Sequence, residues 1–323
     1  MIAAFFAPIA GEAGLGLRDD AALLNAPQGR GLILTKDLLV AGVHFFENDL
    51  PGAIARKALR VNLSDLAAKG AAPLGFLLGL ALPPDWTPDW LKAFAADLAA
   101  DAQDFGCPLL GGDTVKTPGP LTLSITAFGA APAQGMVRRD AALTGDALYV
   151  SGTVGDAALG LRLRLNREED RGWIGALGAE NAAFLADRYL LPRPRLALID
   201  ALGDHARAAM DVSDGLAGDL TKMLALAGLT ADVALADLPL SQAARAALEA
   251  QPALIETICC GGDDYEILCA AAPEKALALE AGAKAAGIKL TRIGQARRGA
   301  VTPIFRNAKG EVLRFERASF SHF

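Results

Sequence analysis

The sequence has few of the features that mark a secreted or membrane-bound protein. Only four of its 323 residues are cysteines, and none of them forms a CxxC pair. A disulfide framework is therefore not expected, and the thiols suit a protein of the reducing cytoplasm. The longest apolar run, Leu74–Leu82, is too short for a membrane span, which takes about 20 residues. The apolar start of the chain lacks the basic residues of a signal peptide, since its first one is Arg18.

Positive charge and aromatic residues are also scarce. The 31 Lys and Arg residues are outnumbered by 37 Asp and Glu residues, which gives a net charge of −6, and aromatics make up 6% of the chain. This composition argues against nucleic-acid and anionic membrane partners. Hydrophobic residues reach 52%, enough for a substantial core, and the length predicts about two domains.

The common short motifs of nucleotide-binding proteins and hydrolases are missing as well. There is no GxxxxGK[ST], HExxH or GxSxG sequence, and Gly14-Leu-Gly16 lacks the third glycine of a dinucleotide fingerprint. The three histidines show no metal-ligand spacing. If the chain handles a nucleotide, it does so with other groups.

Apolar segments with strand and helix character alternate along the chain. We expect strands at 31–35, 74–82, 121–128, 147–150, 265–270, 288–293 and 312–315, and helices at 51–70, 88–106, 156–165, 179–190, 195–209, 215–227 and 274–287. This order predicts an α+β protein with two mixed domains, residues 1–146 and 147–323.

The acids in the chain have an unusual distribution. Aspartates stand beside Gly, Ser or Thr at the ends of apolar segments, in six places that comprise Asp19, Asp20, Asp37, Asp65, Asp113, Asp211, Asp214, Asp263 and Asp264. One such aspartate is usually a helix cap or a turn residue. Six such places are harder to assign to capping alone. Carboxylates bind Mg²⁺ together with phosphates, and adjacent glycines let a phosphate approach backbone N–H groups. We therefore expect a nucleotide site with several metal ions.

Six segments, taken in order, resemble the thiamine-monophosphate kinase family. They are RDDAALL from Arg18, LTKDLLVAGVHF from Leu34, VNLSDLAAKGA from Val61, LGGDT from Leu110, DVSDGL from Asp211 and GGDDYE from Gly261. Their order and spacing match from about residue 10 to the end of the chain. The family belongs to a superfamily with aminoimidazole ribonucleotide synthetase and selenophosphate synthetase.

The resemblance implies both an activity and a fold. The expected reaction transfers the γ-phosphoryl group of ATP to thiamine monophosphate, giving thiamine diphosphate and ADP with the help of several Mg²⁺ ions. The expected fold has two aminoimidazole ribonucleotide synthetase-like domains with ATP in the cleft between them. Strands of the N-terminal domain are expected to pair across a homodimer in the cytoplasm.

The same resemblance implies site residues, position by position. The metal-ligand positions are Asp20, Thr35, Lys36, Asp37, Asp65, Asp113, Asp211 and Asp214. The nucleotide positions are Gly112, Asp113, Arg139 and Ser213. The positions that contact thiamine monophosphate are His44, Asp263 and Phe320. No side chain is expected to act as a general acid or base.

This chain departs from the family pattern at several of these positions. Lys36 replaces a hydroxyl residue, so only its backbone carbonyl remains as a metal ligand, and Asp263 replaces a longer glutamate. Arg18 stands where glycine is usual, and the closing segment 319–323 is altered. These changes bear on substrate contacts more than on ATP and metal binding.

Two alternatives fit the same resemblance less well. The first is a different enzyme of the same superfamily. A selenophosphate synthetase needs a reactive cysteine near the N-terminus, whereas the first cysteine here is Cys107. An enzyme that closes an aminoimidazole ring fits the NLSDLAAKGA and GGDDYE segments less closely. The second alternative is a non-catalytic or altered-substrate member that binds a nucleotide or thiamine phosphate. In that case, Lys36 and Asp263 mark lost activity. Turnover of thiamine monophosphate separates this reading from the kinase.

Overall fold

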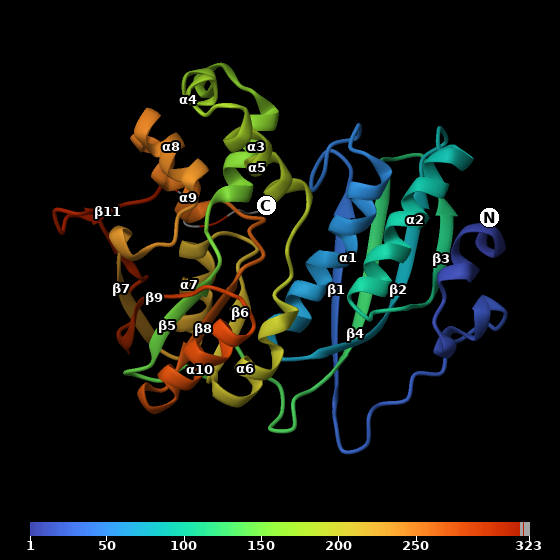
Figure 1. Cartoon of the computed structure of the whole chain (residues 1–323), viewed down its shortest axis with the longest axis horizontal. Helices are drawn as coiled ribbons and strands as arrows, with labels where there is room; N and C mark the ends of the chain where they lie inside the picture. Colours follow the sequence, from blue (N-terminus) through green and yellow to red (C-terminus); the bar gives the residue numbers. More distant parts are fainter. Residues whose placement is uncertain (317–318, 320–323) are drawn as a thin grey trace. The chain divides into compact units, whose positions relative to one another are not determined.

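The computed structural model describes residues 1–316 and 319 of the chain (Figure 1). It divides into two compact units. Unit 1 comprises residues 1–66 and 71–136, and unit 2 comprises residues 67–70 and 137–323. The expected domain boundary at residue 146 stays a prediction. In the described part of the chain, no helix is both long and apolar enough to cross a membrane.

Unit 1 is built on a four-stranded sheet with the order β1-β4-β2-β3. The strands are β1 (Leu32–Val40), β2 (Ala72–Leu82), β3 (Leu109–Lys116) and β4 (Thr122–Ala130), and the helices are α1 (Pro51–Ala68) and α2 (Pro88–Asp104), preceded by the short helical turns η1 (Ile2–Phe6), η2 (Ala7–Ile9) and η3 (Glu12–Leu17). Strands β2 and β3 are parallel and are connected by α2, while β4 runs antiparallel to both of its neighbours.

The two faces of this sheet differ in character. On β4, Leu123, Ile125 and Ala127 are buried, and the residues between them are only half-buried. This alternation is what a strand with one covered face requires. Helices α1 and α2 lie along the covered face (Figure 1). The opposite face carries Leu34 and Leu38 of β1, which are 60% and 51% exposed.

Unit 2 is built on a seven-stranded sheet with the order β11-β10-β7-β9-β5-β8-β6. Its strands are β5 (Ala147–Ser151), β6 (Ala208–Asp211), β7 (Leu229–Ala234), β8 (Ile267–Ala271), β9 (Leu290–Arg298), β10 (Ile304–Arg306) and β11 (Val312–Leu313). Its helices are α3 (Asp156–Leu165), α4 (Arg171–Ala176), α5 (Ala179–Leu190), α6 (Ile199–His205), α7 (Leu216–Ala225), α8 (Gln242–Ala250), α9 (Ile255–Cys260) and α10 (Pro273–Ala285), with the short turns η4 (Glu168–Asp170), η5 (Leu196–Leu198), η6 (Leu235–Asp237) and η7 (Pro252–Leu254).

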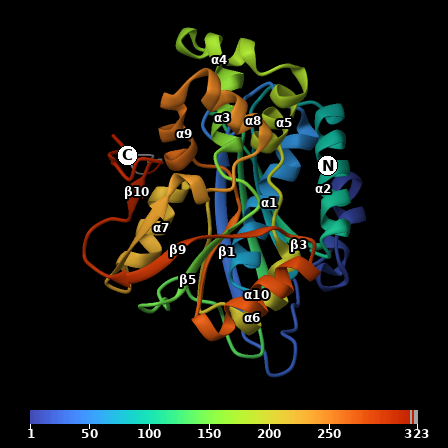
Figure 2. The same ribbon diagram turned by 60° about the vertical axis from the view of Figure 1, so that its left-hand side comes forward.

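Strands β5, β8 and the edge strand β6 are buried on both faces. On β5, Leu148 and Val150 join one hydrophobic core with α3, α5, α7, α8 and α9, whereas Ala147 and Tyr149 join another core with α6 and α10. The last two helices lie side by side (Figure 2). Strands covered on both faces are apolar throughout, so their sequence lacks the alternation of a half-exposed strand.

Most of the expected helices and strands are present, and the differences have physical reasons. The expected strand at 31–35 continues to Val40, because β1 pairs with β4 over its whole length. The prediction of one helix over 195–209 was wrong, since α6 ends at His205 and residues 208–211, three apolar residues followed by Asp211, form the buried strand β6. Strand β3 was not predicted, because the glycine pair in LLGGDTVK interrupts the strand pattern.

Candidate active site

Two sequence-predicted acids of unit 1, Asp37 on β1 and Asp65 on α1, are neighbours. Thr35 and Asp37 lie two residues apart on β1 and therefore point to the same face of the sheet. The Thr35 hydroxyl donates a hydrogen bond to the Asp65 carboxylate. Burial, together with the charge of Asp65, raises the pKa of Asp37 to about 7.

Two effects raise the pKa of Asp37. Burial disfavours a carboxylate, and a second carboxylate close by disfavours it further. A bound cation removes both costs, and hard oxygen ligands of this kind suit Mg²⁺, which typically takes one or two carboxylates and completes its shell with phosphates and water. Among residues 1–316 and 319, no three Asp, Glu, His or Cys side chains gather closely enough to hold a metal ion by themselves.

Lys36 lies between these residues on β1, but its side chain is elsewhere. Its ammonium group donates to the Ser124 hydroxyl of β4 at 2.8 Å. Because side chains alternate along a strand, this contact lies on the open face of the sheet, opposite Thr35 and Asp37. The lysine charge therefore does not neutralise the acid pair.

The glycines of β3 allow a close backbone approach beside Asp113. Gly112 has a φ of +151°, and a Cβ built on it would lie 1.9 Å from the carbonyl oxygen of Leu78 on β2. No other residue fits there without moving the strand. The exposed Asp113 that follows accepts a hydrogen bond from the Thr114 backbone N–H at 2.8 Å. Asp20 is also exposed, in the segment between η3 and β1.

His44 lies in the loop that follows β1. Its Nδ1 accepts a hydrogen bond from the backbone N–H of Val40 at 3.0 Å, and the ring is half-buried. The contact fixes the orientation of the imidazole at the end of the strand and assigns the acceptor role to Nδ1.

In unit 2, the DVSDGL and GGDDYE segments form one structure, because their backbones pair. Beyond the β6–β8 ladder, Asp263 N–H donates to the Ser213 carbonyl at 2.9 Å, and Tyr265 N–H donates to the Val212 carbonyl at 2.9 Å. A Cβ on Gly262 would lie 2.3 Å from the Ser213 oxygen. Glycine at this position thus lets the two loops touch. It has a role in packing as well as in any contact with a ligand.

Asp214 has an internal cation as its partner. The Lys222 ammonium group of α7 contacts the carboxylates of both Asp214 and Asp219, and the Asp214 backbone N–H donates to Asp219 Oδ2 at 2.9 Å. Asp219 is fully buried, and burial raises its pKa. Sequence reasoning missed Asp219 and Lys222, although their i,i+3 spacing on a helix is typical of an ion pair.

The GGDDYE segment has two residues with a left-handed backbone, and its glutamate is held by buried contacts. Asp263 and Tyr265 have φ values of +72° and +51°, which cost free energy in residues other than glycine. The next residue along, Glu266, is fully buried. Its carboxylate receives Arg188 Nη2 at 2.9 Å, Arg195 Nε at 2.6 Å and the Ser151 hydroxyl at 2.6 Å.

Asp264, between those strained residues, points into unit 2. Its carboxylate accepts the backbone N–H groups of Gly155 at 2.5 Å and Ala157 at 3.1 Å, at the start of α3. Complete burial, reinforced by nearby Asp156, raises the pKa of Asp264 to about 8. Of the pair of aspartates in this motif, Asp263 is therefore the one that remains half-exposed.

The remaining sequence-predicted residues in the described ranges differ in their exposure. Arg139 is exposed, next to Arg138, which forms an ion pair with Asp140 at 2.6 Å. Asp211 is buried at the end of β6, and Ser213 is half-buried. Phe320 lies outside the described residues.

Two family models match the chain. The N-terminal domain of AIR synthase related proteins matches residues 18–131, and the C-terminal domain of the same proteins matches residues 144–304. The chain is 44% identical to the thiamine-monophosphate kinase of Caulobacter vibrioides over 284 residues, which cover 87% of this chain and 78% of the relative.

The chain belongs to the thiamine-monophosphate kinase family.

Solved structures of this family have the same fold. The thiamine-monophosphate kinase of Stenotrophomonas maltophilia is 39% identical, with a TM-score of 0.80 over 92% of this chain and 91% of the other. A structure described as AaThiL complexed with AMPPCP and TMP is 28% identical, with a TM-score of 0.77 over 97% and 93% of the two chains. The expected fold of two mixed α+β domains is thereby confirmed, whereas the pairing of strands across a dimer stays a prediction.

Proposed function

We propose that this chain transfers the γ-phosphoryl group of ATP to thiamine monophosphate and releases thiamine diphosphate and ADP. The observation that carries the proposal is the similarity to curated thiamine-monophosphate kinases over most of the chain, at 44% identity for the Caulobacter vibrioides enzyme. The related AaThiL structure holds AMPPCP, a non-hydrolysable analogue of ATP, together with TMP.

The chemistry explains why the site is rich in acids and lacks an evident general base. The acceptor is a phosphate oxygen that already carries negative charge, so no proton has to be removed from it. The obstacle is repulsion between two phosphate chains, since like unit charges at about 4 Å repel by roughly 4 kcal/mol at an effective dielectric constant near 20. Phosphoryl transfer of this kind depends mainly on positioning and on charge stabilisation.

The acid pair of unit 1 fits a divalent cation. We assign Thr35, Asp37 and Asp65 as ligands, because Thr35 and Asp37 share one face of β1, the Thr35 hydroxyl contacts the Asp65 carboxylate, and burial together with Asp65 raises the pKa of Asp37. Lys36 would contribute only its backbone carbonyl, because its side chain contacts Ser124. When bound, Mg²⁺ supplies the positive charge that offsets repulsion between the phosphates. Further ligands are proposed from the family motifs alone and are Asp20, Asp113, Asp211 and Asp214.

The remaining assignments concern ATP and thiamine monophosphate. We assign Gly112, Asp113, Arg139 and Ser213 to the nucleotide, where Gly112 lies exposed on β3 and Arg139 offers an exposed positive charge. We assign His44 and Asp263 to thiamine monophosphate. The left-handed backbone at Asp263 is a conformation that aspartate tolerates better than most residues. Phe320 stays a prediction for the same substrate.

We also propose that the enzyme is a homodimer through the open face of the unit 1 sheet. Exposed Leu34 and Leu38 lie on that face, and a second copy would bury them. Light scattering should show a dimer at micromolar concentration, and Leu38→Glu should shift it to a monomer. A wild-type chain that is monomeric under these conditions would remove this proposal. The four cysteines are all free and buried, which supports our proposal that the enzyme works in the cytoplasm.

One assay tests the proposed reaction against the non-catalytic alternative. The purified chain is incubated with Mg²⁺, ATP and thiamine monophosphate, and the products are separated by chromatography. We expect ADP and thiamine diphosphate in equal amounts. Binding of both substrates without turnover would instead favour a non-catalytic member of the family, and turnover with another phosphate acceptor only would show altered substrate specificity.

A further inference from the structure

A pocket of about 340 Å³ lies in unit 1, and none of the sequence-predicted site residues lines it. It is formed where several segments end: β1 at Ala41, β2 at Leu82, α2 at its first turn, and the residues that lead into β4. Its complete lining is Ala41, Glu47, Leu82, Pro83, Asp85, Trp86, Thr87, Trp90, Pro120 and Leu121. The volume is within the range typical of small-molecule sites.

The aromatic wall of this pocket is preformed. Trp90 stacks on Phe94 with ring centroids 5.3 Å apart and an angle of 16° between the planes. The hydroxyl of Thr87 accepts the backbone N–H of Trp90 at 3.1 Å and so caps helix α2 at this point. Trp86 and Trp90 are two of the three tryptophans in the chain. Buried Leu82 and Leu121 supply apolar surface beside them.

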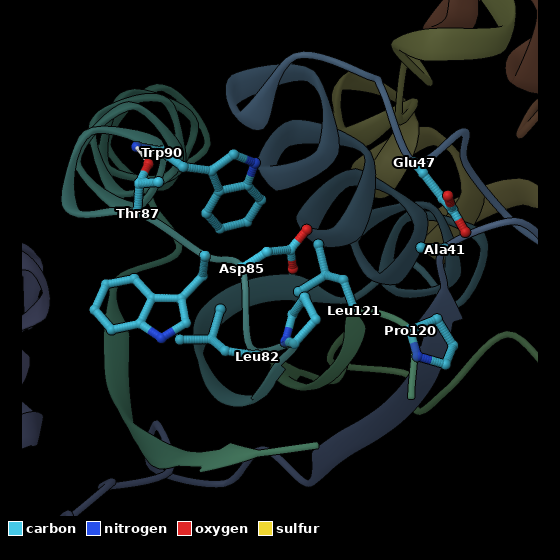
Figure 3. A pocket seen from close by; sticks show the side chains of 10 residues that line it. Ala41, Glu47, Leu82, Asp85, Thr87, Trp90, Pro120 and Leu121 are labelled. Carbon is cyan, nitrogen blue, oxygen red and sulfur yellow. Dashed lines mark hydrogen bonds between the residues drawn. The ribbon is translucent and has the colours of Figure 1, made fainter. Parts of the chain in front are cut away.

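The charges that line the pocket are all negative. Figure 3 shows Asp85 near the centre of the view, with Trp90 on one side and Glu47 on the other. Both carboxylates are exposed, and no hydrogen bond or ion pair joins either of them to another residue in the described ranges 1–316 and 319. The lining contains no Lys or Arg. The negative faces of the indole rings add to this potential.

We propose that this pocket binds a flat organic cation, such as a heteroaromatic ring with a permanently charged nitrogen. Indole faces attract cations, and an aromatic cation also packs on them through its apolar surface. Asp85 and Glu47 supply the opposite charge from two sides. The same features disfavour a phosphate or a nucleotide, because the pocket offers neither a basic side chain nor an anion-binding helix terminus free of acids. The inference thus differs from the phosphate chemistry proposed above.

Two sources could supply such a cation. One is the thiazolium ring of thiamine monophosphate, if the pocket extends the proposed substrate site beyond His44. The other is an unphosphorylated cation that binds without using the phosphate-handling acids. The shared chemistry is an aromatic ring with a positive nitrogen, and a competition experiment distinguishes the sources.

The test uses N-methylquinolinium as a probe and uncharged quinoline as its matched analogue. Binding to the full chain is followed by quenching of tryptophan fluorescence and by calorimetry. We expect saturable binding of the cation and at least about tenfold weaker binding of quinoline, since a desolvated cation–π contact contributes about that factor. Equal binding of the two probes, or no saturable binding, would overturn the proposal.

Substitutions locate the binding. Asp85→Asn combined with Glu47→Gln should weaken binding of the cation by about tenfold or more without changing the melting temperature, because both side chains are exposed. Asp89→Asn is the matched control, since Asp89 is an exposed acid on the first turn of α2 that does not line the pocket. Equal losses in the two variants would contradict the assignment.

A final titration in saturating thiamine monophosphate identifies the source of the cation. Unchanged affinity for the probe shows a separate cation site, and lost affinity shows that the substrate ring occupies the pocket. Both results support the pocket as a cation site. Because probe binding requires neither ATP nor turnover, its failure leaves the proposed kinase reaction untouched.

Discussion

Two acid clusters, Glu266 with its arginines in unit 2 and Asp37 with Asp65 in unit 1, are balanced differently. In unit 2, Glu266 is enclosed by Arg188 and Arg195, and Lys222 contacts Asp214 and Asp219. In unit 1, Asp37 has another acid, Asp65, as the neighbour that shifts its pKa. An acid with a built-in cation can stabilise the fold, whereas the Asp37–Asp65 pair is the one to which we assign a cation from outside. We therefore expect a substitution at Glu266 to act mainly on stability and one at Asp65 mainly on activity.

The largest effect on stability is expected for Glu266→Ala. This change leaves the Arg188 guanidinium buried without its carboxylate, and removing one partner of a buried pair costs about 3–5 kcal/mol. Urea unfolding measures the loss. Asp187→Ala is the control, because the ion pair of Asp187 with Arg193 is exposed, and such a pair contributes about 1 kcal/mol or less. A Glu266 variant as stable as the control would show that this acid and its arginines do not stabilise the fold.

A comparably large effect, on turnover this time, is expected for Asp65→Asn. Losing one charged group that stabilises the reacting phosphates should lower kcat by about 10²–10³-fold. The melting temperature should hold or rise, because repulsion of Asp37 disappears. The assay is ADP release with thiamine monophosphate, with Asp89→Asn as the control in the same unit. Near-normal turnover would show that Asp65 does not hold the metal.

A smaller effect is expected when Mg²⁺ is added without substrates. A ligand that binds only the folded state stabilises it by about 2.7 kcal/mol at a hundred times its Kd. Thermal unfolding of the wild-type chain should shift upward with Mg²⁺, and the Asp65→Asn variant should shift less. Asp187→Asn, an exposed change in unit 2 at a residue not assigned to the metal, should leave this shift intact. An identical shift in wild type and Asp65→Asn would place the metal elsewhere.

The smallest effect, counted per pH unit, is the pH dependence of the unfolding free energy that Asp264 of unit 2 causes. The raised pKa of Asp264 means that the folded chain keeps a proton that the unfolded chain has released above its ordinary pKa of 3.8. Its contribution to stability therefore falls as the pH rises toward about 8, by at most about 1.4 kcal/mol per pH unit. Asp264→Asn should reduce this slope in urea unfolding between about pH 7 and about pH 8, above the pKa of about 7 at which Asp37 in unit 1 releases its proton. Asp187→Asn should keep it, and equal slopes in both variants would show that Asp264 is ionised.

Sequence patterns predicted much of the framework on which these comparisons rest. The helices at 156–165 and 179–190 match α3 and α5 to the residue, because helical periodicity and capping are local properties. Strands with two buried faces, such as β6, were harder, since an apolar run without alternation also suits a helix. Strand β1 was expected to end at Thr35, and only its pairing with β4 shows that Asp37 lies on the same strand.

The chain's own residues, taken in order, thus determined its family, its alternating elements and the list of acids that suit magnesium and phosphate. Those properties reside in short segments and in the chemistry of single side chains. The tertiary structure alone decided which acids receive a partner, because Glu266 meets arginines more than 70 residues away along the chain and the aromatic pocket takes its walls from several segments. Such contacts depend on how strands and helices pack, and no local pattern encodes them.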